Sequence, residues 1–262
     1  MTDTAMRRLP SAGTLLLAQI RYQAKLLAGG RAVVIGVGLP VILLIASSTR
    51  QAHPGAADIA GYACFGLTLT AWNTYGVRLV AAREAGVLKR WRATPLPRWC
   101  YFLGRIVACV IVAAIAGVAT VLAAVLLYHT HLSSSAWLGA LAAFVLGGAA
   151  WAAAATALSA AIPTTEAAAP TLLLIYFPAI VISGVIGSIS EPHWLYTLST
   201  YLPAQPLISA VTSALSHPPG TPLLPVRDVV VLAAWAAAGL ASAVVVFRWE
   251  PHRPAARRPP RR

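Results

Sequence analysis

Stretches of about 20 consecutive, mostly apolar residues recur along this chain of 262 residues. A helix needs about 20 such residues to cross a hydrocarbon core of about 30 Å, because each residue adds about 1.5 Å. Charged residues make up only 10% of the sequence, against about 25% in an average soluble domain. A water-soluble fold could not cover its surface with so few charges. The sequence therefore predicts an all-α integral membrane protein.

Six stretches are long and apolar enough to cross the bilayer. We predict transmembrane helices over residues 32–48, 59–82, 104–128, 136–162, 167–189 and 228–247. The whole chain, residues 1–262, then forms one transmembrane domain with short connections between most of its spans.

Residues 10–29 show a different pattern, with apolar and polar side chains on opposite sides of a predicted helix. The apolar side carries Leu16, Leu17, Ile20, Ala24 and Leu27, and the other side carries Gln19, Arg21, Gln23 and Lys25. An amphipathic helix of this kind suits the membrane interface. We therefore predict an N-terminal interfacial elbow helix before the first span.

Residues 191–226, between the fifth and sixth predicted spans, form neither a long span nor a polar linker. Their apolar residues repeat at helical spacing, and Pro203 and Pro206 interrupt the pattern. We predict one or two short re-entrant helices that dip into the outer leaflet, because backbone at membrane depth needs cover from protein. A loop on the membrane surface with interfacial Trp and Tyr is the alternative.

The distribution of basic residues predicts the orientation of the chain. Of its 20 Lys and Arg residues, 17 lie in the N-terminal segment up to the first span, in residues 83–105 and in the tail after residue 247. By the positive-inside rule, these three segments are cytoplasmic. The net charge of +13 therefore reflects membrane orientation and does not indicate a nucleic-acid partner. Heavy use of Arg and Ala further suggests a bacterial protein of the inner membrane, with both termini in the cytoplasm.

The sequence offers no constellation typical of an enzyme or of a metal centre. Its seven acidic residues fall at span ends, in loops or in the termini, and the three cysteines form no CxxC pair. His129 and His131 lie in a predicted polar loop, where histidines are usually surface residues. We expect no metal and no bound cofactor, although a membrane enzyme or its anchor remains an alternative.

The absence of certain residues and motifs also limits which energy sources could drive transport. An ion-coupled carrier normally keeps ionisable groups at mid-membrane, and the predicted spans have none there. The chain also has no phosphate-binding loop of the Gly-x-x-x-x-Gly-Lys-[Ser/Thr] kind. If the protein moves a solute uphill, we expect a separate subunit to supply the work. An ion-coupled carrier is retained as an alternative.

Residues 83–98 connect the second and third predicted spans and carry a dense basic pattern. Val87, Leu88 and Trp91 share one side of a short predicted helix, basic residues ring the other sides, and Pro95 and Pro97 end it. Such a helix could bind a cytoplasmic partner or anchor lipid headgroups. The charge pattern alone does not decide between these two roles.

The residues of this loop carry a family resemblance. Residues 83–97 read REAGVLKRWRATPLP, residues 201–206 read YLPAQP and residues 247–251 read FRWEP. With the elbow helix and six spans, these strings resemble ABC-2 type transporter permeases (type V exporter-like) of the drug and antibiotic export kind. The sequence departs from the usual loop at Trp91, where a smaller aliphatic residue is more common.

The resemblance implies an efflux permease subunit, with no catalytic residue of its own, that pairs with a second copy or a related subunit. It also implies docking of two separate ABC ATP-binding subunits, which would hold the ATP and Mg. Residues 83–98 would then act as the cytoplasmic coupling helix. The implied ATPase-coupling residues are Arg83, Glu84, Gly86, Lys89, Arg90 and Arg92.

The substrate path is predicted from polar and aromatic residues inside the spans. The candidates are Phe65, Thr68, Trp72, Asn73 and Tyr75 in the second span, with Tyr176 in the fifth. Apart from Asn73, those in the second span share a helical stripe that could face a translocation cavity, although helix packing explains the same pattern. The class of exporter implies a hydrophobic or amphipathic substrate such as a drug, an antibiotic or a lipid-like molecule.

Overall fold

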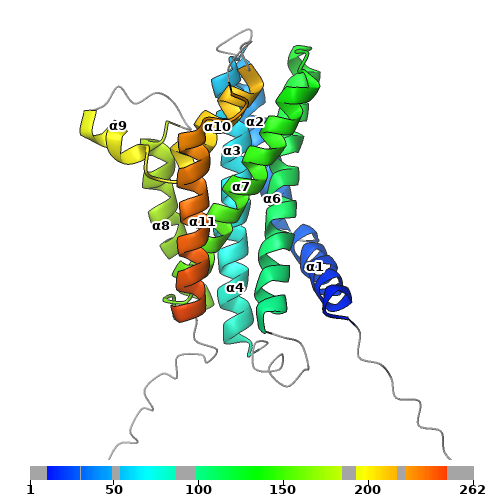
Figure 1. The fold of residues 1–262 in the computed structure, drawn as a ribbon, viewed down its shortest axis with the longest axis vertical. Coiled ribbons are helices and arrows are strands. Elements are labelled where there is room, and N and C mark those ends of the chain that lie inside the picture. The colour runs from blue at the N-terminus through cyan, green and yellow to red at the C-terminus, as the bar shows by residue number, and fades with distance from the viewer. Residues whose placement is uncertain are drawn as a thin grey trace, which may run out of the picture.

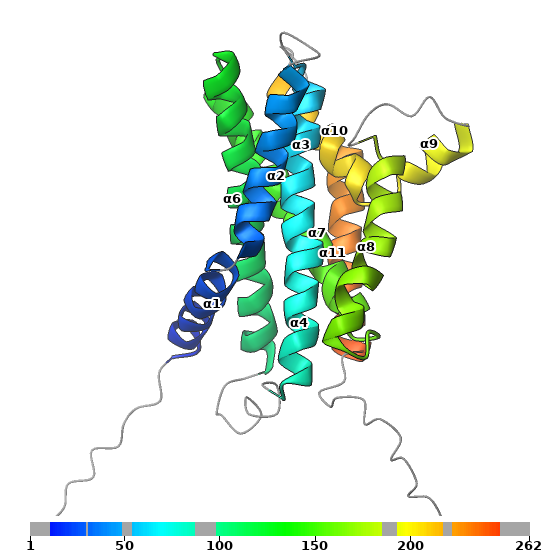
Figure 2. The same ribbon diagram turned by 180° about the vertical axis from the view of Figure 1, so that it is seen from behind.

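The computed structural model describes residues 11–29, 31–48, 54–86, 98–184, 193–216 and 222–246. Every regular element within these ranges is a helix, which confirms the predicted all-α class for them. Figures 1 and 2 show an elongated bundle of long, roughly parallel helices. Helix α1 leaves the bundle at its lower end, and α9 projects from its side near the upper end.

Helix α1 (Ala12–Ala28) occupies the place of the predicted elbow helix and precedes α2 (Arg31–Ser48). Its buried residues are Gln19, Gln23 and Leu27, on the side that packs against α6 (Arg98–Tyr128). Leu17 and Tyr22 are exposed instead. The expected division of faces is therefore wrong for the two glutamines, because α6 presents Gly104 to α1 and leaves room for the Gln19 side chain.

The second predicted span, 59–82, is a single continuous rod of three elements. Helix α3 (Ala56–Thr68) passes into a π-helical turn, η1 (Leu69–Thr74), and then into α4 (Tyr75–Glu84). Its start is fixed where the Gly55 backbone N–H donates to Asp58 Oδ2 at 3.0 Å. Helix α2 packs closely on α3, since a Cβ atom on Gly66 would lie only 2.5 Å from the Gly36 carbonyl oxygen.

The third and fourth predicted spans correspond to α6 and to α7 (Ser134–Ser159). Helix α6 begins six residues before the predicted start at residue 104, and α7 begins where the Ser133 hydroxyl accepts from the Ala136 N–H at 3.2 Å. A short turn then joins α7 to α8 (Thr165–Ile182). Helix α8 ends before the predicted limit at residue 189, and Gly184 follows it with φ of 74°.

The predicted outer segment contains two short helices, α9 (His193–Ser199) and α10 (Ala204–Ser216). Helix α10 buries one side against α3 and α7, whereas α9 leaves most of its apolar side chains exposed. The last helix, α11 (Val226–Val246), lies close to the predicted limits 228–247 and packs mainly on α7.

Among the described residues, three stretches are long and apolar enough to cross a membrane: Cys100–Tyr128, Ser134–Ser159 and Thr165–Ile182. Helix α2 contributes a shorter apolar stretch, Val34–Ser47. Helix α1 begins, and α11 ends, at the lower end of the bundle, where α4 also ends and α6 begins (Figures 1 and 2). The described chain thus enters and leaves the bundle at the end where α4 ends and α6 begins.

Candidate functional site

Arg83, in the last turn of α4, faces the interior although its position predicted a surface residue. Only 3% of it is exposed. Its guanidinium donates to the carbonyl oxygens of Ser159 at 2.9 Å and Ala160 at 3.0 Å, and also to that of Ile162. These carbonyls lie at or just after the end of α7, where helical partners are missing and the helix dipole favours a cation. Arg83 therefore caps the C-terminus of α7.

Glu84, the next residue, binds the beginning of α8. Its carboxylate accepts from the Thr165 backbone N–H at 2.8 Å and from the Thr165 hydroxyl. Thr165 is the first residue of α8, where free N–H groups and the helix dipole favour an anion. The two hydrogen bonds from Thr165 hold the pKa of the Glu84 carboxyl below its usual value. The carboxylate is exposed and stays ionised at neutral pH.

Two consecutive residues of α4 thus hold the two sides of one turn. We call Arg83 and Glu84 the α4 bracket, because Arg83 binds the end of α7 and Glu84 binds the start of α8. The arrangement is electrostatically matched, since the cation meets carbonyl oxygens and the anion meets an N–H group. As a result, the end of α4 is attached to the turn that joins α7 to α8.

Gly86 terminates α4 two residues after the α4 bracket. Its φ of 66° lies in the left-handed region that favours glycine, and its N–H donates to the Arg83 carbonyl at 3.1 Å. The structure therefore gives Gly86 a backbone role, and the predicted ATPase contact of Gly86 stays a prediction. Lys89, Arg90 and Arg92 lie outside the described residues, as does most of the predicted coupling helix 83–98.

Arg78 connects α4 to the elbow helix in a similar manner. Its guanidinium donates to the Leu26 carbonyl, in the last turn of α1. Nearby, Arg105 of α6 is buried; it donates to the Tyr101 hydroxyl at 2.8 Å and lies 5.7 Å from the ring centroid of Tyr75. Helix α4 therefore carries polar attachments to α1, α7 and α8 within ten residues.

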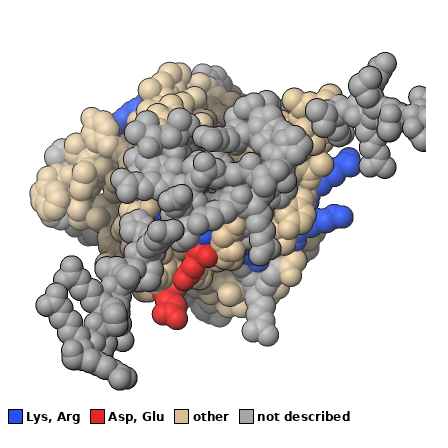
Figure 3. All heavy atoms as spheres, turned by 90° about the horizontal axis from the view of Figure 1, so that it is seen from below, with Lys and Arg blue, Asp and Glu red and all other residues tan. Residues whose placement is uncertain are grey.

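Charge is unevenly distributed over the lower face, which Figure 3 views from below. Among the described residues, acidic side chains gather on one part of the face, several basic side chains project at its right edge, and a basic side chain also lies beside the acidic ones. Glu84 and Glu166, beside the α7–α8 turn, are exposed, as are Arg21 and Lys25 on α1. This end of the bundle can thus bind charged groups of either sign in different places.

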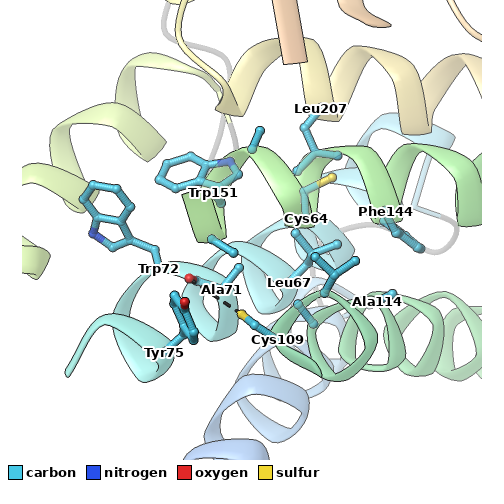
Figure 4. Packing of buried hydrophobic residues seen from close by; sticks show 14 of the residues in the cluster. Cys64, Leu67, Ala71, Trp72, Tyr75, Cys109, Ala114, Phe144, Trp151 and Leu207 are labelled. Carbon is cyan, nitrogen blue, oxygen red and sulfur yellow. Dashed lines mark hydrogen bonds between the residues drawn. The ribbon is translucent and has the colours of Figure 1, made fainter. Parts of the chain in front are cut away.

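Most of the predicted substrate-path residues meet in a buried aromatic cluster, part of which Figure 4 shows. The Tyr176 hydroxyl lies 2.9 Å from Thr68 Oγ1 and donates to the Phe65 carbonyl at 3.2 Å. Trp72 donates to the Leu172 carbonyl at 2.8 Å. All four predicted residues in the cluster are at most 6% exposed, so in this conformation their packing matches the alternative of a helix interface.

The other two substrate-path candidates, Tyr75 and Asn73, make different contacts, although Tyr75 belongs to the same buried core (Figure 4). The Tyr75 hydroxyl pairs with Thr156 Oγ1 of α7 at 3.0 Å, and its ring faces Arg105. Asn73 is half-buried in η1, and its Oδ1 atom is buried with no hydrogen-bond partner. The role of these six residues in substrate passage stays a prediction.

Trp151 of α7 belongs to the same cluster and was not predicted from the sequence. Its ring meets the Trp72 ring edge to face, with centroids 5.4 Å apart, and lies 5.9 Å from the Tyr176 ring. In the sequence, Trp151 stands in a run of alanines and glycines, GGAAWAAAA, where it is the one large side chain. A single large side chain among small ones indicates a residue that fills the space between helices, and this signal could have identified Trp151 from the sequence.

Within the described residues, no group of three or more His, Cys, Asp or Glu side chains could hold a metal ion. Cys64, Cys100 and Cys109 are buried free thiols. Among these residues, the site consists of helix caps and aromatic packing.

Long apolar helices with capped ends and a single end rich in charge define a multi-pass membrane protein. The comparison with protein families identifies it further: the model of the ABC-2 type transporter family matches residues 18–215. The chain belongs to this family, whose members form the membrane components of ABC transporters and associate with ABC ATP-binding subunits. Comparison with curated proteins found no match.

Proposed function

We propose that this chain is the permease subunit of an ATP-driven exporter in the inner membrane of a bacterium. Its six spans are α2, residues 59–82 of the α3–η1–α4 rod, α6, α7, α8 and α11. Both termini and residues 83–98 are cytoplasmic, and α9 and α10 form the outer re-entrant segment. The permease works as a dimer and moves a hydrophobic or amphipathic substrate with ATP hydrolysed by a separate subunit.

The observation that carries this proposal, beyond family membership, is the α4 bracket. The partner ATPase docks on residues 83–98, where Lys89, Arg90 and Arg92 are its charge partners. This segment begins at Arg83 and Glu84, which hold the end of α7 and the start of α8. A displacement of the docked segment therefore reaches two further spans through short polar contacts, as a transporter driven from its cytoplasmic side requires.

The proposal is tested by searching the genes beside that of this chain for one that encodes a phosphate-loop ATPase and by expressing the two together. We expect the two subunits to elute together and to hydrolyse ATP when reconstituted in lipid nanodiscs. The double variant Arg90→Glu, Arg92→Glu should insert normally but release the ATPase. The matched control is Arg21→Glu, Lys25→Glu, which reverses the same number of charges on exposed residues of α1, at the same end of the bundle (Figure 1).

Two results would contradict the proposal. The first is a correctly inserted permease from which no ATPase can be co-purified. The second is uptake or export by the permease alone that collapses when a proton or sodium gradient is removed, because this would identify the ion-coupled alternative.

A further inference from the structure

A cavity of about 360 Å³ lies between α7, α8 and α11. Helix α11 packs mainly on α7, and α8 packs on α4 and η1, so a crevice remains between α8 and α11. Its lining residues are Trp72, Trp151, Ala154, Ala157, Leu158, Ile175, Ala179, Leu202, Pro203, Trp235, Ala238, Gly239 and Ser242. Since Ile175 and Ala238 in its wall are exposed, the crevice opens to the side of the bundle.

Three tryptophans from three different helical elements line this cavity: Trp72, Trp151 and Trp235. Trp72 is held by its hydrogen bond to the Leu172 carbonyl, and Trp235 donates to the Tyr201 carbonyl at 2.8 Å. The indole N–H groups of Trp72 and Trp235 are therefore occupied by the protein. The Trp151 Nε1 atom is buried without a hydrogen-bond partner. Trp72 and Trp151 are only 6% and 2% exposed, so the half-buried Trp235 presents the most open aromatic surface to the cavity and the other two indoles form its inner wall.

Small residues provide the space beside the tryptophans. Ala154 and Ala157 of α7 and Ala238 of α11 line the cavity without filling it. Gly239 allows α11 to approach α7 closely, because a Cβ atom at this position would lie 2.6 Å from the backbone of Ala153. The close contact of α11 with α7 leaves the space on the side of α8. The cavity thus follows from the placement of large and small side chains.

A second hollow on the same bundle shows which occupant the first one suits. It has a volume of about 770 Å³ and lies along α6, with walls also from α7 and α11. All its lining side chains are aliphatic, which matches the acyl chains of surrounding lipid. The smaller cavity differs by its aromatic walls, since indole rings pair with other rings in edge-to-face or offset geometry. Its volume lies within the range of about 300–1,000 Å³ typical of small-molecule sites.

We propose that the cavity between α7, α8 and α11 binds the flat aromatic part of a hydrophobic molecule that enters sideways from the bilayer. The inference rests on the proposed function in one respect, that the bound molecule is a transport substrate. It adds the chemical class of that substrate, a planar aromatic compound, and a binding site within one protomer. This site includes Trp72 of the predicted path together with Trp151 and Trp235.

The test uses the full-length permease in phosphatidylcholine nanodiscs with 1-pyrenemethanol as the probe. Energy transfer from tryptophan to pyrene reports binding. The two baselines are nanodiscs without permease and permease nanodiscs without probe. We expect saturable transfer with the wild type and its loss in Ala154→Phe, which fills the cavity. Ala149→Phe is the matched control, because Ala149 lies on the same helix and lines the aliphatic hollow instead.

A second variant, Ala238→Phe, fills the cavity from the exposed side of α11 and keeps the test valid if Ala154→Phe fails to insert. Transfer that never saturates, or that falls equally in Ala149→Phe, would overturn the proposal. Because binding is measured without the ATPase, failure here is distinct from failure of the permease assignment.

If the bound molecule is a substrate, 1-pyrenemethanol should stimulate ATP hydrolysis by the complete transporter. We expect this stimulation to be lost in Ala154→Phe and Ala238→Phe and to be kept in Ala149→Phe. Saturable binding without any stimulation of the wild type would overturn the substrate assignment and leave a lipid-facing binding site.

Discussion

Replacing Arg83 by Met tests the α4 bracket most directly, because Met keeps an unbranched stem and removes the guanidinium. Arg83 is buried and donates to three carbonyl groups at the end of α7. A hydrogen bond from a charged donor contributes about 1.5–3 kcal/mol, and the contributions of several hydrogen bonds from one guanidinium group do not add up fully. We therefore expect the substitution to lower the local stability of the α7–α8 turn by about 3–4 kcal/mol. At about 1.4 kcal/mol per tenfold change, local opening of the α7–α8 turn should become about 100 to 1,000 times more frequent.

Hydrogen–deuterium exchange in nanodiscs measures this opening at the backbone amides of residues 159–169. The control is Arg78→Met, the same substitution five residues earlier on α4, where the guanidinium binds the Leu26 carbonyl of α1. Arg83→Met should accelerate exchange in the α7–α8 turn, and Arg78→Met should accelerate it in the last turn of α1. Arg83→Lys should give an intermediate rate, since one ammonium cannot reproduce the fork. Unchanged exchange at residues 159–169 in Arg83→Met would refute the reasoning.

Three further predictions concern the same end of the bundle. Glu84→Gln should weaken the contact with Thr165 at neutral pH. Because the pKa of Glu84 is lowered in the folded protein, the wild-type contact should be complete above the usual carboxyl pKa and should be lost as the pH falls through the lowered folded pKa, which hydrogen–deuterium exchange at the start of α8 can follow. Gly86→Val should cost about 1–2 kcal/mol because φ is 66°, whereas Gly86→Asn should recover much of the thermal stability; equal losses would argue against a backbone role. Gly104→Leu should displace α1, since even a Cβ atom at this position would lie 2.8 Å from Gln19 Cγ. The displacement should increase proteolysis near residue 29. The control Gly13→Ala, whose added Cβ meets open space, should leave proteolysis unchanged.

The long helices were predictable because the bilayer imposes a simple length requirement on apolar runs. Helices α7 and α11 lie within a few residues of their predicted limits. The end of α8 was placed too late, because Gly184 adopts a left-handed backbone conformation that apolar periodicity does not reveal. The π-helical turn η1 also leaves the apolar pattern intact and was not predicted.

The direction of charged and amide side chains was less predictable. The sequence placed Arg83 on a surface helix, yet its partners at the end of α7 lie 76 to 79 residues further along the chain. Gln19 and Gln23 were assigned to a polar face for a similar reason, since a glutamine can be buried where a glycine such as Gly104 makes space. In both cases the deciding contact is tertiary. Sequence alone could locate the segment 83–98, because its basic composition sets it apart from the spans.

The α4 bracket and the tryptophan-lined cavity lie on the same two helical rods. Glu84 binds Thr165 at the first residue of α8, and Trp72 binds the Leu172 carbonyl seven residues later, about 10 Å along that helix. Ile175 and Ala179, which line the cavity, follow within the next two turns of α8. A shift of α8 relative to the α3–η1–α4 rod would therefore either move the cavity wall past Trp72 or break the hydrogen bond between Trp72 and the Leu172 carbonyl. Either event changes the shape of the cavity, so movement of the docked segment would alter the affinity for an aromatic ligand, and the ligand would bias that movement in return.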